Sequence, residues 1–172
     1  MLKLVGAFLI VGGCAAFGML ERFRLGLRLR QLKQAGELMK SLESEITYGK
    51  AALADACRET AGRMEEPYAE FLMHVFETCC QNEGRAFGDI WKQELAESGK
   101  KLLLTPEETG LLEQFGVCSG YMDLGLQEAG VQRIGQELKK RTEKTERENA
   151  DRMKVSLCLS AAGGIVLAML LI

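Results

Sequence analysis

The feature that most limits the fold of this chain is the position of its charges, which are confined to the middle of 172 residues. Every acidic residue lies between Glu21 and Asp151, and all but one of the basic residues lie between Arg22 and Lys154. The overall share of 27% charged residues and the net charge of −2 therefore average over unlike parts. The chain divides into a charged middle and two apolar ends.

The two ends each contain an uncharged run, Leu4–Leu20 with 17 residues and Val155–Ile172 with 18. As helices these runs would be roughly 26 Å long, close to the ~30 Å hydrocarbon core of a bilayer. The second run has nine Val, Leu or Ile residues and no central charge, which favours insertion. We therefore predict transmembrane helices within segments 1–20 and 155–172. A buried core helix is the alternative for the second run.

The first run has two further interpretations. A cleaved secretory signal would begin with a positively charged segment, for which Lys3 is the only basic residue here, and "VGGC" ending at Cys14 is similar to a lipoprotein cleavage site. However, apolar character continues after Cys14 through "AAFGML". This continuation favours an uncleaved membrane anchor.

Basic residues flank both runs on the side of the middle segment. They are Arg22, Arg24, Arg28, Arg30 and Lys33 after the first run, and Lys139, Lys140, Arg141, Lys144, Arg147, Arg152 and Lys154 before the second. The positive-inside rule then places residues 21–154 in the cytoplasm and both termini outside. The first cluster is explained by anionic lipid headgroups, and we expect no nucleic-acid binding.

The middle segment shows helical periodicity. Apolar residues step by threes, fours and one seven along a first long helix, with Gly36 expected to fill the gap: Leu25, Leu29, Leu32, Met39, Leu42 and Ile46. Further helices are expected over Leu53–Met64, from Pro67 to Gly84, from Phe87 to Gly99, from Thr105 to Gly120, and from about Asp123 onwards. We therefore predict an all-α, six-helix bundle-like cytosolic domain flanked by two membrane helices.

Two stretches near helix ends carry specific expectations. In "LTPEETGLLEQF", Thr105, Pro106 and Glu108 predict a capping box. Between Lys139 and Lys154 the apolar stripe disappears and opposite charges stand four apart, which predicts a solvated helix leading to the last span.

The residues that carry most chemistry are sparse. His74 is the single histidine, and the six cysteines include no C-x-x-C pair and no metal-ligand spacing. Free, mostly buried thiols fit a reducing cytoplasm. No phosphate-binding, dinucleotide or nucleophile-elbow motif is present in the sequence. We therefore expect no catalytic residue, no metal site and no cofactor.

The stretch "LESEITYG" places Glu43, Glu45 and Tyr48 at the end of the first long helix. Carboxylates at a helix C-terminus face the unfavourable end of its dipole. A basic patch of a partner or a bound cation would offset that cost. Solvated carboxylates with a neighbouring arginine are the alternative.

Small residues recur every four positions in both apolar runs: Gly12 and Ala16 in the first, and Ser156, Ser160, Gly164 and Ala168 in the second. Such stripes allow close packing of helices in lipid, although small residues are common in membrane helices generally. We keep these six residues as candidates for membrane helix packing.

Several of these stretches together resemble the stage III sporulation protein AB family of endospore-forming bacteria. The resemblance spans the whole chain and is carried by "MLKLVGAFLIVGG", "LRQLKQAGELMKSLESEITYG" and "LEQFGVCSGYMDLGLQ". It adds Asp123 and Gln127 to Glu43, Glu45 and Tyr48 as candidate partner-binding residues. Two positions depart from the family pattern, since Ala52 stands where a proline is expected and Ser119 where a leucine is more usual.

The resemblance implies a non-enzymatic protein of the mother-cell membrane around the forespore, required for endospore formation. There it would support a secretion-like channel complex through a domain similar to that of the type II secretion platform protein. Implied partners are a cytoplasmic secretion-type ATPase of the same operon and other membrane proteins of the complex. The bilayer and a second copy of the chain are further expected partners. A membrane-tethered catalytic or signalling module and a coiled-coil spacer are the alternatives.

Overall fold

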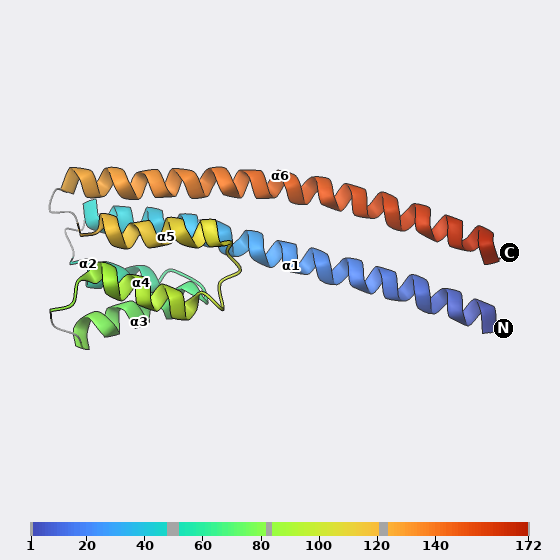
Figure 1. Ribbon diagram of the computed structural model, residues 1–172, viewed down its shortest axis with the longest axis horizontal. Helices are drawn as coiled ribbons and strands as arrows, with labels where there is room; N and C mark the ends of the chain where they lie inside the picture. The colour runs from blue at the N-terminus through green and yellow to red at the C-terminus, as the bar shows by residue number, and fades with distance from the viewer. Residues whose placement is uncertain (1, 48–51, 82–83, 121–123, 172) are drawn as a thin grey trace. The chain divides into compact units, whose positions relative to one another are not determined.

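A computed structural model describes residues 2–47, 52–81, 84–120 and 124–171. Side chains are described at residues 13, 16, 18–47, 52–81, 84–120 and 125–152. Within these ranges the chain contains helices and no strand, so the predicted all-α class is confirmed (Figure 1). The helices are α1 (Leu2–Thr47), α2 (Leu53–Ala61), α3 (Tyr68–Gln81), α4 (Phe87–Ser98), α5 (Pro106–Cys118) and α6 (Leu124–Leu171).

The contacts of the chain divide it into two compact units. One unit is Arg30–Thr142, and the other joins Met1–Leu29 with Glu143–Ile172. Both long helices, α1 and α6, contribute to both units. The Arg30–Thr142 unit contains the whole hydrophobic core and is called the helical domain below.

The ends of the chain were predicted to cross a membrane. Among the residues that the structure describes, no helix is long and apolar enough for that. The predicted spans, Leu4–Leu20 and Val155–Ile172, fall largely on residues whose side chains lie outside the described part. The predicted limits 1–20, 21–154 and 155–172 therefore stay predictions.

The core face of α1 follows the predicted stripe with one correction. Leu32, Met39 and Leu42 are fully buried, as expected, but Ala35 and Leu38 complete the stripe. Gly36, which we expected to fill the gap, is only half-buried. The expectation was wrong because Gly36 lies about 100° around the helix from Ala35, away from the core.

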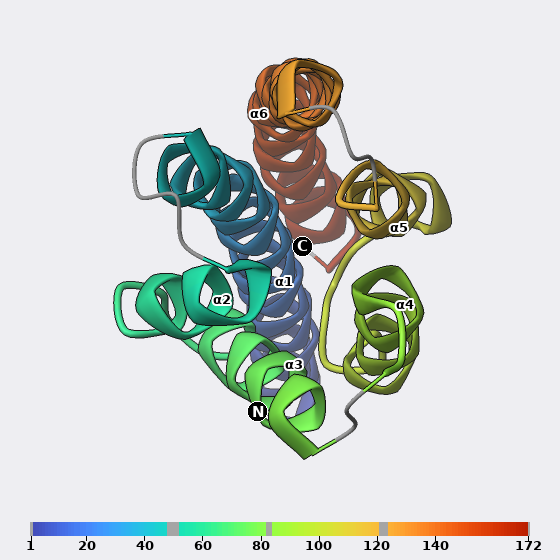
Figure 2. The same ribbon diagram turned by 90° about the vertical axis from the view of Figure 1, so that its left-hand side faces the viewer.

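Short helices build the remaining wall of the helical domain. Figure 2 shows α3, α4 and α5 following one another around this unit, with α6 beside α5. The α5–α6 contact is close, because a Cβ added at Gly130 would lie 2.7 Å from the Sγ atom of Cys118. Apolar side chains from all six helices meet in one core.

The predicted capping box at the start of α5 is confirmed. The backbone N–H of Glu108 donates to the Thr105 hydroxyl at 3.3 Å, and the Glu108 carboxylate accepts from the Thr105 N–H at 2.7 Å. These bonds satisfy two donors that an uncapped helix end leaves unpaired. The start of α3 is one residue later than predicted, since Pro67 precedes the helix and its carbonyl accepts from the Phe71 N–H.

Four aromatic rings fill the space between α3, α4 and α5. The Trp91 ring lies 4.8 Å from that of Phe71, 4.6 Å from that of Phe115 and 5.9 Å from that of Phe87. The indole N–H of Trp91 donates to the Leu112 carbonyl at 2.8 Å, so the only polar group of this buried ring is satisfied. This cluster anchors the short helices.

The α4–α5 pair makes its closest approach at two glycines. A Cβ added at Gly88 would lie 2.5 Å from the carbonyl oxygen of Gly116, and one at Gly116 would lie 3.0 Å from Cδ1 of Trp91. Real Cβ atoms essentially never come as close as 2.5 Å. The glycines therefore set the distance between the two helices.

Candidate functional site

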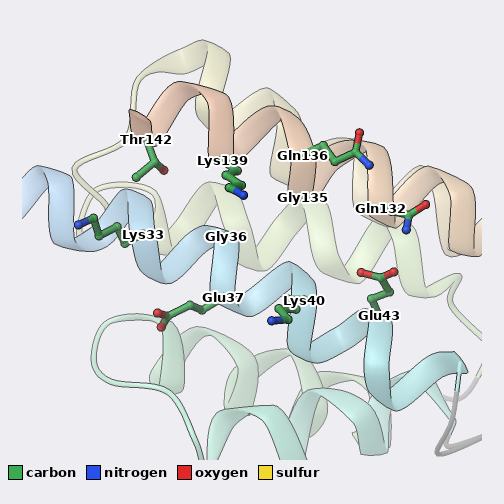
Figure 3. Close-up of a pocket in the computed structure, with 10 residues that line it drawn as sticks. All are labelled: Lys33, Gly36, Glu37, Lys40, Glu43, Gln132, Gly135, Gln136, Lys139 and Thr142. Carbon is green, nitrogen blue, oxygen red and sulfur yellow. The ribbon is translucent and has the colours of Figure 1, made fainter. Parts of the chain in front are cut away.

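A groove runs between α1 and α6 on the surface of the helical domain, with a volume of about 450 Å³ (Figure 3). Five residues from each helix line it: Lys33, Gly36, Glu37, Lys40 and Glu43 from α1, and Gln132, Gly135, Gln136, Lys139 and Thr142 from α6. All ten lie within the Arg30–Thr142 unit. A cavity of this size accommodates several side chains of a partner.

Two glycines keep the groove open. Gly36 and Gly135 face it from opposite helices, and a Cβ added at Gly36 would meet nothing within 4 Å. A Cβ at Gly135 would meet only the Met39 Cβ, at 3.9 Å. Larger residues at these two positions would occupy the space between the helices, so the groove depends on both glycines.

The α1 side of the groove alternates in charge. Lys33, Glu37, Lys40 and Glu43 follow one another at intervals of four, three and three residues, which places them on one side of the helix. In Figure 3, Glu43 points towards the α6 segment that carries Gln132, and Lys139 points from α6 towards α1. The groove thus presents both signs of charge to an incoming partner.

These charges are little used inside the molecule. Among the residues that the structure describes, no ion pair engages Glu37, Lys40, Glu43 or Lys139. Exposed ion pairs contribute little to the free energy of folding. Stability alone therefore does not explain why residues of alternating charge line this side of α1. Complementary charges on a partner would be recognised here by sign and spacing.

The two glutamates of the "LESEITYG" stretch have different surroundings. Glu43 lines the groove, whereas the Glu45 carboxylate accepts from the Arg63 guanidinium at 2.5 Å. Arg63 follows the end of α2 and offsets the unfavourable helix-end position of Glu45. Glu45 therefore has the neighbouring arginine that we considered as the alternative to a partner.

The remaining candidate residues are spread over the chain. Gln127 is buried on α6, with 5% of its surface exposed. Tyr48 and Asp123 lie outside the described residues. Of the predicted membrane-packing residues only Ala16 has a described side chain, and it is exposed. The packing of the other five, Gly12, Ser156, Ser160, Gly164 and Ala168, lies outside what the structure describes.

A polar network around Glu65 escaped the sequence interpretation. Arg30 donates to the Glu65 carboxylate at 2.5 Å and Gln34 donates to it at 3.0 Å. The Gln31 carbonyl accepts from the Tyr68 hydroxyl at 3.0 Å. Arg30, which we assigned to lipid headgroups with its basic neighbours, thus contacts another part of its own chain. Because Arg30 and Glu65 are 35 residues apart, no local sequence pattern indicated this contact.

The thiols and the histidine are apart from the groove. Burial, and secondarily the nearby Cys79, raise the pKa of the Cys57 thiol, so this thiol stays protonated. His74 is exposed on α3. Within the described ranges, no group of three or more His, Cys, Asp or Glu residues could hold a metal ion. The α1–α6 groove therefore remains the candidate site within these ranges.

Comparisons with known proteins connect this fold to a family. The model of the family described as stage III sporulation protein AB matches residues 3–172. The chain belongs to this family. Stage III sporulation protein AB of Bacillus subtilis (strain 168) is 28% identical over 171 residues, which is 99% of each chain. A solved structure of stage III sporulation protein AB (SpoIIIAB) has 25% identity and a TM-score of 0.66, covering 70% of this chain and 94% of that one.

Membership gives the chain a role in sporulation, and the family is not a known enzyme family. The two departures from the family pattern have simple local outcomes. Ala52 precedes α2 with φ −60°, close to the value that a proline ring imposes. The Ser119 hydroxyl donates to the Gly116 carbonyl at 2.8 Å and so satisfies a carbonyl at the end of α5. Both helix ends keep regular geometry in this family member.

Proposed function

We propose that this protein is a non-enzymatic membrane scaffold of the mother-cell channel complex in sporulation, a secretion-like apparatus across the envelope. Its helical domain docks a cytoplasmic secretion-type ATPase. The observation that carries the docking proposal is the α1–α6 groove, in which ordered charges lie beside open space. The family membership supplies the sporulation setting.

Membrane anchoring is part of the same proposal. The uncharged runs Leu4–Leu20 and Val155–Ile172 are each long enough to cross the hydrocarbon core as helices. Their basic flanks favour a cytoplasmic position for the helical domain, with both termini outside. In that arrangement the groove is accessible to a cytoplasmic partner and the anchors hold the complex at the membrane.

The charges that border the groove suit a helix of the ATPase that carries complementary charges. The α1 side of the groove repeats charged residues at intervals of three and four, which matches the spacing of side chains on a partner helix. Glutamines from α6 add donors and acceptors on the other side. Other membrane proteins of the complex would then contact surfaces outside the groove.

The proposal is tested by filling the groove. In Gly36→Leu the new side chain enters open space, so the fold is expected to persist while the partner helix is excluded. The matched control is Gly110→Leu on α5, where a Cβ also meets nothing within 4 Å. The measurement is capture of the operon's ATPase by full-length protein solubilised in detergent, with helicity checked by circular dichroism.

We expect Gly36→Leu to reduce capture at least about tenfold and Gly110→Leu to leave it unchanged. Glu43→Lys should also weaken capture, because it reverses one charge in the groove. Its control is Glu77→Lys, an exposed glutamate on α3. Equal capture by wild type, Gly36→Leu and Glu43→Lys would exclude the groove as the docking site.

A further inference from the structure

The two ends of the α1–α6 groove differ in charge. Lys33 and Lys139 lie towards one end, whereas the other end has Glu43 beside the uncharged Gln132 (Figure 3). The α1 row alone alternates in sign, so it favours neither direction. Lys139 removes this balance, because among the described lining residues α6 contributes one cation and no acid. The groove is therefore positive towards the Lys33 end and negative at the Glu43 end.

The middle of the groove is neutral and open. Glu37 and Lys40 carry opposite charges three residues apart and offset each other. Between the two ends lie Gly36 and Gly135, whose missing side chains leave the open space (Figure 3). The nearest atom to a Cβ added at Gly135 is the Cβ of the buried Met39, at 3.9 Å. An apolar side chain of a partner fits this part of the groove.

The length of the groove matches that of a short helix. Lys33 and Glu43 are ten residues apart on α1, which corresponds to about 15 Å along the helix. An average helix in a globular protein has about 10–14 residues and is therefore of similar length. Both ends of a docked helix then lie close to the charged ends of the groove.

A docked helix has a polarity of its own. The first turn of a helix carries a partial positive charge and the last turn a partial negative one. The N-terminus is therefore favoured at Glu43, and the C-terminus beside Lys33 and Lys139. Since α1 runs from Lys33 to Glu43, a helix docked in this way runs antiparallel to α1 and in the same direction as α6.

We infer that the groove binds the ATPase helix in this one direction and reads a fixed order of side chains on it. A basic residue lies at Glu43, an apolar residue fills the space between the two glycines, and an acidic residue lies at Lys139. In Figure 3, Lys139 points towards the α1 segment that carries Gly36, seven residues before Glu43. The basic residue of the partner should thus precede the acidic one by about two helical turns.

This inference rests on the proposed docking of the ATPase and adds the direction and the charge order of the docked segment. Site-specific photo-cross-linking tests both. Gln132→benzoylphenylalanine and Thr142→benzoylphenylalanine place a photoreactive group at each end of the groove without changing a charge. Glu77→benzoylphenylalanine, at an exposed position on α3, is the control. The full-length protein in detergent is irradiated with the captured ATPase, and the cross-linked peptides are mapped by mass spectrometry.

Both groove positions should cross-link to one helix of the ATPase. The product from position 142 should lie about 10 residues C-terminal to the product from position 132, and the helix between them should carry a base before an acid. The opposite order, or products in two different helices, would overturn the inference and leave the docking site intact. Cross-linking no stronger at either groove position than at position 77 would overturn the docking site itself.

Charge reversal at Lys139 provides a second measurement. Lys139→Glu should reduce ATPase capture at least about tenfold, because it places like charges together at the end that receives the acidic residue. Lys92→Glu is the matched control, an exposed lysine on α4 outside the groove, and should capture the ATPase as wild type does. Unchanged capture by Lys139→Glu would contradict the assigned charge order. Loss of capture in Gly36→Leu alone would then support docking in the groove without this direction.

Discussion

In the α4–α5 pair Gly88 and Gly116 bring two helix backbones into contact, whereas in the α1–α6 pair Gly36 and Gly135 leave a groove. The added-Cβ distances separate the two cases. At Gly88 the new atom would lie 2.5 Å from a backbone oxygen, and at Gly36 it would meet nothing within 4 Å. The same residue type therefore serves packing in one region and access in the other.

The surroundings explain this difference. The α4–α5 contact lies beside the buried Trp91 ring, where every added atom displaces another. The α1–α6 groove is bordered by charged and amide side chains that extend into solvent. Substitutions of equal size should consequently have opposite effects in the two regions.

The largest effect is expected from removing the aromatic anchor of the packed region. Trp91→Ala should lower the free energy of unfolding by about 3–5 kcal/mol, because it leaves a large cavity between Phe71 and Phe115. Urea unfolding of the full-length protein, followed by circular dichroism, measures this loss. Trp91→Phe is the control that keeps an aromatic ring and should lose less. Wild-type stability in Trp91→Ala would show that the cluster does not anchor the short helices.

A smaller loss is expected from overpacking the α4–α5 contact. Gly88→Ala should lower the free energy of unfolding by about 1–3 kcal/mol, because the added methyl group collides with the Gly116 backbone and the helices must separate. The same urea titration measures it. Gly110→Ala on α5 is the control, with open space around the new methyl group. The close contact between α4 and α5 would be disproved if Gly88→Ala were as stable as that control.

A glycine-to-alanine substitution in the groove should stabilise the protein instead of destabilising it. Gly36→Ala is expected to raise the free energy of unfolding by about 0.5–1 kcal/mol, since alanine restricts the unfolded chain and meets no neighbour in the helix. Measured beside Gly88→Ala, it compares one substitution in two settings. A loss of stability in Gly36→Ala would mean that the groove is closed in solution.

The smallest effect is expected at the end of α1. Arg63→Ala removes the ion pair with Glu45 and should cost about 0.2–1 kcal/mol, because Arg63 is more than half exposed and solvent screens the pair. The loss should shrink in high salt. Lys92→Ala on α4 is the control, because it removes an exposed cation that has no ion pair with the described residues. A loss of several kcal/mol at Arg63 would point to a structural role larger than an exposed ion pair.

Local signals predicted much of the fold. The capping box at Thr105 and Glu108 depends on residues three apart, so it was readable from the sequence and is confirmed. The apolar stripe of α1 was predicted from helical period, although Gly36 was placed on the wrong side of it. The resemblance to the stage III sporulation protein AB family, stated from three stretches, is confirmed over residues 3–172.

The candidate site was less predictable, because its two walls are distant in sequence. Glu43 was selected for its position at a helix end, and the structure places it in a groove with Gln132 and Lys139. Glu45 was selected with it, but a contact to Arg63, 18 residues away, separates the two carboxylates. No local pattern indicated that Gly36 and Gly135 face each other.

By itself the sequence determined the helical class, most of the helix starts and the segregation of charge from the apolar ends. These properties follow from periodicity, caps and composition within a few residues of each other. Only the tertiary structure decided which glycines form a contact and which leave a groove, and which carboxylate is paired. Those outcomes depend on distances between helices, which side chains far apart in the chain set when they pack together.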